Sequence, residues 1–79
     1  MPGRTAHSTV EVKAQELWER MARLSLSQNA LARVLDITSG HLSLILCGKR
    51  RPSAALRGRM LRVLRANFDD LFYVVHQDE

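Results

Sequence analysis

Apolar residues recur at helical spacing near the start of the chain. Their intervals of four and three predict an amphipathic helix, with an apolar stripe made of Val10, Ala14, Leu17, Met21 and Leu24. Ser8 and Glu11 have the Ser-x-x-Glu spacing of a capping box, so this helix is expected to begin near Val10. Residues 1–7 lack such a pattern and are expected to form a flexible arm before one domain over 8–79.

Three further helices are predicted from a hydroxyl residue that can cap the first turn and from the apolar positions that follow it. The expected helices are 28–35 after Ser27, 39–47 after Thr38, and 54–65 after Ser53. Gly48 is expected to end the second of them in a left-handed conformation. The inward positions are expected to be Leu31, Ala32, Leu35, Leu42, Ile45, Leu46, Leu56, Met60, Leu61 and Leu64.

A fifth helix is predicted to start after Asn67, which can cap it. Asp69 and Asp70 then lie at the positive end of the helix dipole, and Phe68, Leu71 and Phe72 give the helix a core face. Because no pair of strands is predicted, the expected fold is all-α, a compact domain of five helices.

The composition limits the classes of function. The chain has 79 residues, of which 46% are hydrophobic and 25% charged, which indicates one small folded domain. The lone Cys47 excludes an internal disulfide, and the three histidines have no metal-ligand spacing, so no metal or cofactor is expected. A chain this short rarely encloses a substrate, and no catalytic triad is recognisable, so no enzymatic activity is expected.

Neither a membrane span nor a secretory signal is predicted. The chain contains no apolar run near the roughly 20 residues that a spanning helix needs. Residues 1–7 also lack the apolar centre of a signal peptide, so the expected location is the cytoplasm.

The charges are unevenly distributed along the chain. Residues 37–66 contain seven Lys and Arg and no acid, whereas residues 67–79 contain four acids and no Lys or Arg. A polyanion would be attracted to the basic segment, and the release of its counterions would contribute to the affinity.

Residues 28–47 resemble the helix-turn-helix of the phage Cro and lambda-repressor-like family, and the resemblance extends from about Leu17 to Phe72. The motif positions are occupied by Gln28, Ala32, Ile37, Leu42 and Ile45. Residues 48–53, with the sequence Gly-Lys-Arg-Arg-Pro-Ser, resemble the exit loop of that family. The resemblance implies a lambda-repressor-like fold with a central helix-turn-helix and double-stranded DNA as the partner.

This spacing also has a physical reason. Two short helices that cross steeply need a small residue where they approach, here Ala32, and an apolar residue in the corner, here Ile37. The corner position that the family usually gives to Gly is Asp36, which tolerates a left-handed conformation. Helix 39–47 is then expected to protrude and to fit the major groove.

The resemblance implies two sets of DNA contacts. The base-facing set is Ser39, Gly40, His41, Ser43, Leu44 and Cys47, and the phosphate-binding set is Gln28, Asn29, Lys49, Arg50 and Arg51. No base-facing residue is Arg, Lys, Asn or Gln, the side chains that make bidentate base contacts. We therefore expect weak direct readout, with specificity from DNA shape, methyl contacts and dimer spacing.

Two other segments admit more than one interpretation. Tyr73, Val74 and Val75 follow the expected core and form either a homodimer seam or a segment that folds back over its own domain. Most of the arginines at 57, 59, 62 and 65 are expected to form a solvated face.

The function predicted from these features is a DNA-binding transcriptional regulator that represses by occupying a promoter, with no small-molecule effector evident. The alternative is a protein-interaction module, such as an antitoxin or phage accessory protein, that binds a protein through the helix-turn-helix and the apolar C-terminus. The Leu-rich, Arg-free helix 39–47 favours that alternative.

Overall fold

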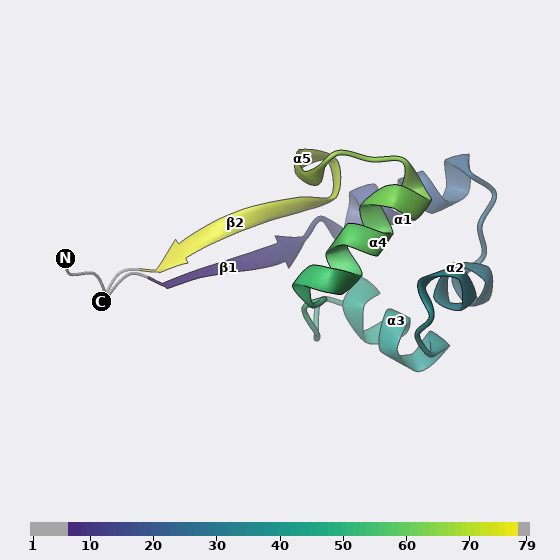
Figure 1. The fold of residues 1–79 in the computed structure, drawn as a ribbon, viewed down its shortest axis with the longest axis horizontal. Coiled ribbons are helices and arrows are strands. Elements are labelled where there is room, and N and C mark those ends of the chain that lie inside the picture. Colours follow the sequence, from purple (N-terminus) through teal and green to yellow (C-terminus); the bar gives the residue numbers. More distant parts are fainter. Residues whose placement is uncertain (1–6, 78–79) are drawn as a thin grey trace.

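The computed structural model describes residues 7–77, which form five helices and two strands (Figure 1). The helices gather into one body, and the two strands form a ribbon that extends from it (Figure 1). In chain order the elements are β1 His7–Val12, α1 Ala14–Arg23, α2 Gln28–Leu35, α3 Ser39–Leu46, α4 Ala54–Leu64, α5 Phe68–Leu71 and β2 Phe72–Gln77. The arm expected over residues 1–7 lies, apart from His7, outside the described residues.

The expectation of a compact, mostly helical domain is confirmed, but the fold is not all-α, because β1 and β2 pair as an antiparallel two-stranded sheet. Val12 lies opposite Phe72, and Val10 lies opposite Val74. The Lys13 N–H continues the ladder by donating to the Leu71 carbonyl at 2.7 Å. The fold is therefore mostly helical, and β1 and β2, which flank the helices in the sequence, pair with each other.

The expected start of the first helix is also wrong. Val10 belongs to β1, and α1 begins only at Ala14, so the helical stripe of the sequence holds from Ala14 onward. Glu11, the expected capping-box acid, instead accepts a hydrogen bond from Arg51 in a distant loop. Val10, Glu11 and Val12 alternate between apolar and charged side chains, which is the period of a strand, but three residues are too short a pattern to outweigh the helical stripe.

The predicted caps of the next three helices are confirmed. Each hydroxyl accepts a backbone N–H three residues ahead: Ser27 from Ala30 at 3.0 Å, Thr38 from His41 at 3.0 Å, and Ser53 from Leu56 at 3.2 Å. Gly48 has φ 77°, the left-handed conformation expected after α3. These local signals place the helix-turn-helix and α4 to within one residue of the prediction.

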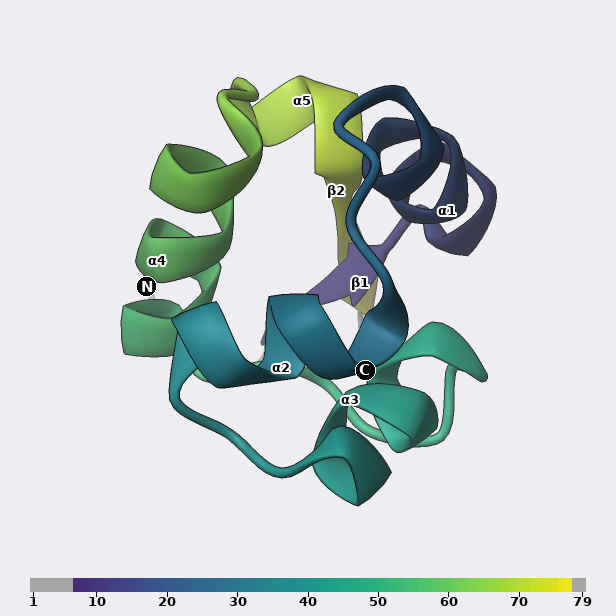
Figure 2. The same ribbon diagram turned by 90° about the vertical axis from the view of Figure 1, so that its right-hand side faces the viewer.

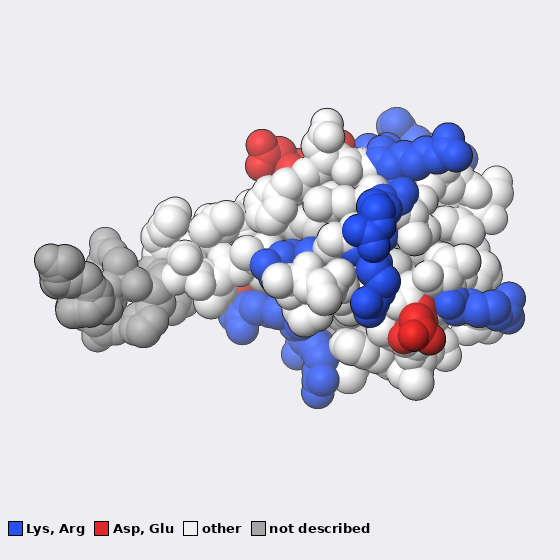
Figure 3. Space-filling view, viewed as in Figure 1, with Lys and Arg blue, Asp and Glu red and all other residues white. Residues whose placement is uncertain are grey.

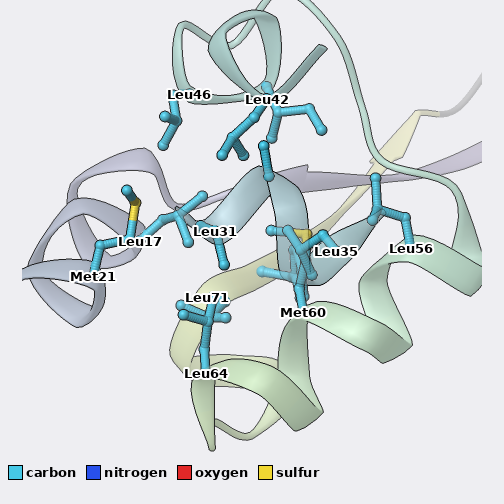
Figure 4. Close-up of a cluster of buried hydrophobic side chains, with 13 residues drawn as sticks. Leu17, Met21, Leu31, Leu35, Leu42, Leu46, Leu56, Met60, Leu64 and Leu71 are labelled. Carbon is cyan, nitrogen blue, oxygen red and sulfur yellow. The ribbon is translucent and has the colours of Figure 1, made fainter. Parts of the chain in front are cut away.

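The five helices surround one hydrophobic core (Figure 2). Figure 4 shows buried side chains from different helices pointing toward a common centre. Most of the predicted inward positions are buried, and Phe72 at the base of β2 joins them. The buried core consists of Leu17, Met21, Leu31, Ala32, Leu35, Leu42, Ile45, Leu46, Leu56, Met60, Leu64, Leu71 and Phe72.

The two sides of α3 give a matched test of this core. Leu42→Ala removes a side chain with 0% exposure and is expected to lower the free energy of unfolding by about 2–5 kcal/mol. Leu44→Ala makes the same chemical change at a position with 41% exposure and is expected to cost less than about 1 kcal/mol. Urea unfolding followed by circular dichroism measures both, and equal losses would contradict the orientation of α3.

Candidate nucleic-acid interface

The corner between α2 and α3 is built as the sequence predicts. Ala32 is buried where the two helices approach, and its carbonyl accepts the Ile37 N–H at 3.0 Å. The Ile37 side chain packs against the core. Asp36 adopts φ 62° and ψ 43°, the left-handed conformation that ends α2 and turns the chain toward α3.

Two side-chain hydrogen bonds hold the ends of α2. Gln28, in its first turn, donates from Nε2 to the Ser39 carbonyl at 3.2 Å, so the N-terminal ends of α2 and α3 lie together. At the other end, Arg59 of α4 donates from Nε to the Leu35 carbonyl at 3.1 Å. An open hollow remains at this corner, lined by Asn29, Ala32, Arg33, Asp36, Ile37 and Ser39.

α3 has one buried side and one open side. Leu42, Ile45 and Leu46 face the core. All six base-facing candidates lie away from that core: Ser39, Gly40, Leu44 and Cys47 are exposed, while His41 and Ser43 are half-buried. The exposed side of α3 is therefore free to meet a partner.

The phosphate-binding candidates separate into free and engaged side chains. Asn29, Lys49 and Arg50 are exposed, and neither Lys49 nor Arg50 has an ion-pair partner among residues 7–77. Gln28 is half-buried and already bonded to Ser39. Arg51 forms an ion pair with Glu11 of β1, with 2.8 Å between Nε and Oε2.

The free cations directly follow α3. The Lys49 N–H donates to the Leu44 carbonyl at 2.9 Å, which fixes the turn against the last turn of the helix. Figure 3 shows Lys and Arg side chains over α4 and around the turn between α3 and α4. Positive charge beyond the C-terminal end of a helix also interacts favourably with its dipole.

The arginines at 57, 59, 62 and 65 do not form one solvated face. Arg62 and Arg65 are exposed, as expected for most of the group. Arg57 and Arg59 are half-buried, and each donates to a backbone carbonyl: Arg57 to Pro52 at 3.1 Å and Arg59 to Leu35 at 3.1 Å. Only the structure shows this role, because a sequence does not reveal which backbone carbonyl lacks a donor.

The C-terminal apolar run lies in the ribbon. Tyr73 and Val74 are 46% and 44% exposed, and Val75 is half-buried. The Lys13–Leu71 hydrogen bond sets the alternation of the ladder, so the backbone N–H and C=O of Val74 point away from β1. Among residues 7–77, the backbone groups of Val74 on the outer edge of β2 therefore have no partner, and they lie beside exposed apolar side chains.

Residues 7–77 contain neither a cluster of metal-binding side chains nor a helix suited to span a membrane. No group of three or more His, Cys, Asp and Glu is placed to hold a metal ion in this part of the chain. None of its helices combines the length and the apolar character needed to cross a membrane.

Comparison with known proteins identifies the family of this chain. An uncharacterized HTH-type transcriptional regulator of Bacillus subtilis (strain 168), YvzC, is 31% identical to the chain over 64 residues, which cover 81% of this chain and 83% of the relative. The chain belongs to the HTH-type transcriptional regulators. No protein-family model matches it.

The same fold occurs in a solved structure. The crystal structure of the transcriptional regulator VanUg matches this member of the HTH-type regulators with a TM-score of 0.67. The match covers 98% of this chain and 96% of that one at 10% sequence identity. At so low an identity the match establishes the fold alone.

Asp36 gives a stability prediction for this HTH corner. Asp36→Gly is expected to raise the free energy of unfolding by about 1 kcal/mol, because Gly adopts the left-handed conformation without strain and the acid leaves the negative end of the α2 dipole. Asp36→Asn removes only the charge and is expected to give the smaller part of the gain. Chemical unfolding measures both, and a less stable Gly variant would contradict this account.

Proposed function

We propose that this HTH-type regulator binds double-stranded DNA and represses transcription by occupying a promoter. One observation carries the proposal: the open side of α3 is followed directly by Lys49 and Arg50, two exposed cations without an acidic partner among residues 7–77. The family membership supports DNA as the partner.

In the proposed complex α3 lies in the major groove, which is about 12 Å wide and admits one helix. Its open side faces the base edges. Asn29 and the free backbone N–H groups in the first turn of α2 contact phosphates on one side of the groove. Lys49 and Arg50 contact phosphates beyond the other end of α3.

Arg51 has a smaller role in this complex than Lys49 and Arg50. Its ion pair with Glu11 is partly exposed, and such pairs contribute only about 0–1 kcal/mol to stability. A phosphate can therefore compete for the same guanidinium at small cost. We assign the main electrostatic contribution to Lys49 and Arg50, and a smaller one to Arg51.

The alternative function, a protein-interaction module, is favoured by one feature of the surface. Val34 on α2 is 51% exposed and Leu44 on α3 is 41% exposed, so the helix-turn-helix presents apolar as well as polar groups. A protein partner would bury these side chains without needing the cations. The dependence of binding on salt distinguishes the two functions.

We further propose that the regulator is a homodimer joined along β2. A two-stranded ribbon is marginally stable unless further strands or a packed layer support it. The outer edge of β2 offers backbone groups that no residue of 7–77 pairs with, and Tyr73, Val74 and Val75 carry no charge that would repel a second copy. Antiparallel pairing of β2 with its symmetry mate gives a four-stranded sheet related by a two-fold axis.

Salt titration tests the DNA interface. The wild-type protein is expected to bind a duplex of random sequence with an affinity that falls steeply as salt rises. Arg50→Ala removes one phosphate contact and is expected to reduce the log–log slope by about 0.9, with a further step of similar size for Lys49→Ala. Fluorescence anisotropy between low and physiological salt measures the slope.

Arg62→Ala is the matched control, because it also removes one positive charge from an exposed position but lies on α4. It is expected to leave the slope nearly unchanged. Equal effects of Arg50→Ala and Arg62→Ala would show that DNA binding depends on the net charge of the protein and not on a contact at Arg50. Undetectable binding at low salt would contradict DNA as the partner and favour the interaction module.

Sedimentation equilibrium tests the dimer. The wild-type chain is expected to sediment at micromolar concentration with twice its 9.0 kDa mass. Val74→Glu places like charges along the seam and is expected to give the monomer mass. Val34→Glu, at a similarly exposed position on α2, is expected to remain dimeric. A wild-type monomer would exclude the seam.

A further inference from the structure

Gly40 occupies a position where the fold of this chain does not require glycine. Its φ is not in the positive range that L side chains avoid, and an added Cβ would meet no atom within 4 Å apart from its chain neighbours and the backbone of its own helix. Gly48 differs, since its φ of 77° suits glycine. In a helix, glycine is a poorer residue than alanine because the backbone loses more entropy on ordering. The fold would therefore gain from alanine at position 40.

The missing side chain leaves open space on the exposed side of α3. Leu44 lies one turn further along, and residues four apart are neighbours on a helix surface. A helical side chain leans toward the turn N-terminal to its own Cα, so Leu44 leans toward the side of Gly40. We call this open space beside Gly40, flanked by Leu44, the notch.

The chemistry of the notch suits a methyl group. Leu44 is 41% exposed, so its apolar surface faces water unless a partner covers it. The neighbouring candidates, Ser39 and Ser43, hydrogen-bond to almost any base and give little discrimination. In the major groove, thymine presents a C5-methyl group, and uracil and cytosine lack it.

We propose that the notch receives the C5-methyl group of a pyrimidine in the major groove, with Gly40 providing the space and Leu44 the apolar contact. The proposal rests on the DNA binding proposed above and names the chemical group that α3 reads. Thymine and 5-methylcytosine both carry this group, so the experiment includes both. The open side of α3 then selects its site by steric fit to a methyl group and not by bidentate hydrogen bonds.

The test begins with selection of bound sequences from a random duplex library by the wild-type protein. Each thymine of the selected site is then replaced in turn by deoxyuridine, which removes only the methyl group. At one position per half-site we expect the dissociation constant to rise about fourfold, the value of one buried methyl group. Leu44→Ala is expected to bind the thymine and uracil duplexes equally at that position.

Gly40→Ala fills the notch and has a matched control in Gly58→Ala, another helical glycine, whose added Cβ makes only an ordinary contact at 3.8 Å with Arg62. Both variants are expected to raise the melting temperature by about 2–5 °C. Only Gly40→Ala is expected to weaken binding to the thymine duplex, about tenfold, and to abolish its advantage over the uracil duplex.

A third duplex identifies the source of the methyl group. 5-Methylcytosine replaces cytosine in a C·G pair at the same position, and recovered affinity would show that the notch reads the methyl group on either base. Absence of recovery would assign the notch to thymine. Equal binding of the thymine and uracil duplexes by the wild type, or unchanged binding by Gly40→Ala, would overturn the notch while leaving DNA binding intact. Absence of duplex binding at low salt would instead overturn the proposed function.

Discussion

The crossing of α2 and α3 is the constraint on which the rest of the molecule depends. Ala32 lets the two helices approach, and the Ile37 N–H donates to its carbonyl at 3.0 Å, so the corner is fixed by both packing and a hydrogen bond. Gln28 and Arg59 then hold the two ends of α2 to α3 and α4. Because close-packed helices cannot slide without opening cavities, the corner fixes which side of α3 faces the core and which faces outward.

The arginines of this chain have two different roles: some bind groups within the protein, and others are free to contact a partner. The net charge does not distinguish between these roles. Arg57 and Arg59 bind backbone carbonyls, and Arg20 contacts both Asp70, at 3.6 Å, and the Arg65 carbonyl, at 3.2 Å. An arginine bonded to a carbonyl keeps its charge but loses the freedom to follow a phosphate. Attraction to a polyanion is then a property of the whole basic surface, whereas close contact belongs to the few side chains that remain free.

The parts of the fold that were predictable from sequence are those set by neighbours along the chain. Ser27, Thr38 and Ser53 cap their helices by bonds to residues three positions ahead, so a short window of sequence contains the whole signal. β1 is different, because its partner β2 lies at the other end of the chain. Val10 satisfies the helical stripe and the strand equally well, and only its pairing with Val74 decides between them.

The candidate site also has one part that was predictable from sequence and one part that was not. The helical period predicts that Leu42 and Ile45 face the core, and both are buried. Ser39, Gly40 and Leu44, which the family resemblance implies as base-facing, are exposed. The engagement of Arg51 by Glu11 was not predictable, since it joins the loop after α3 to a strand whose existence was itself missed. This ion pair is too exposed to add much stability. Its physical effect is to link the basic loop to the ribbon, because the Arg51 guanidinium lies 2.8 Å from the Glu11 carboxylate of β1.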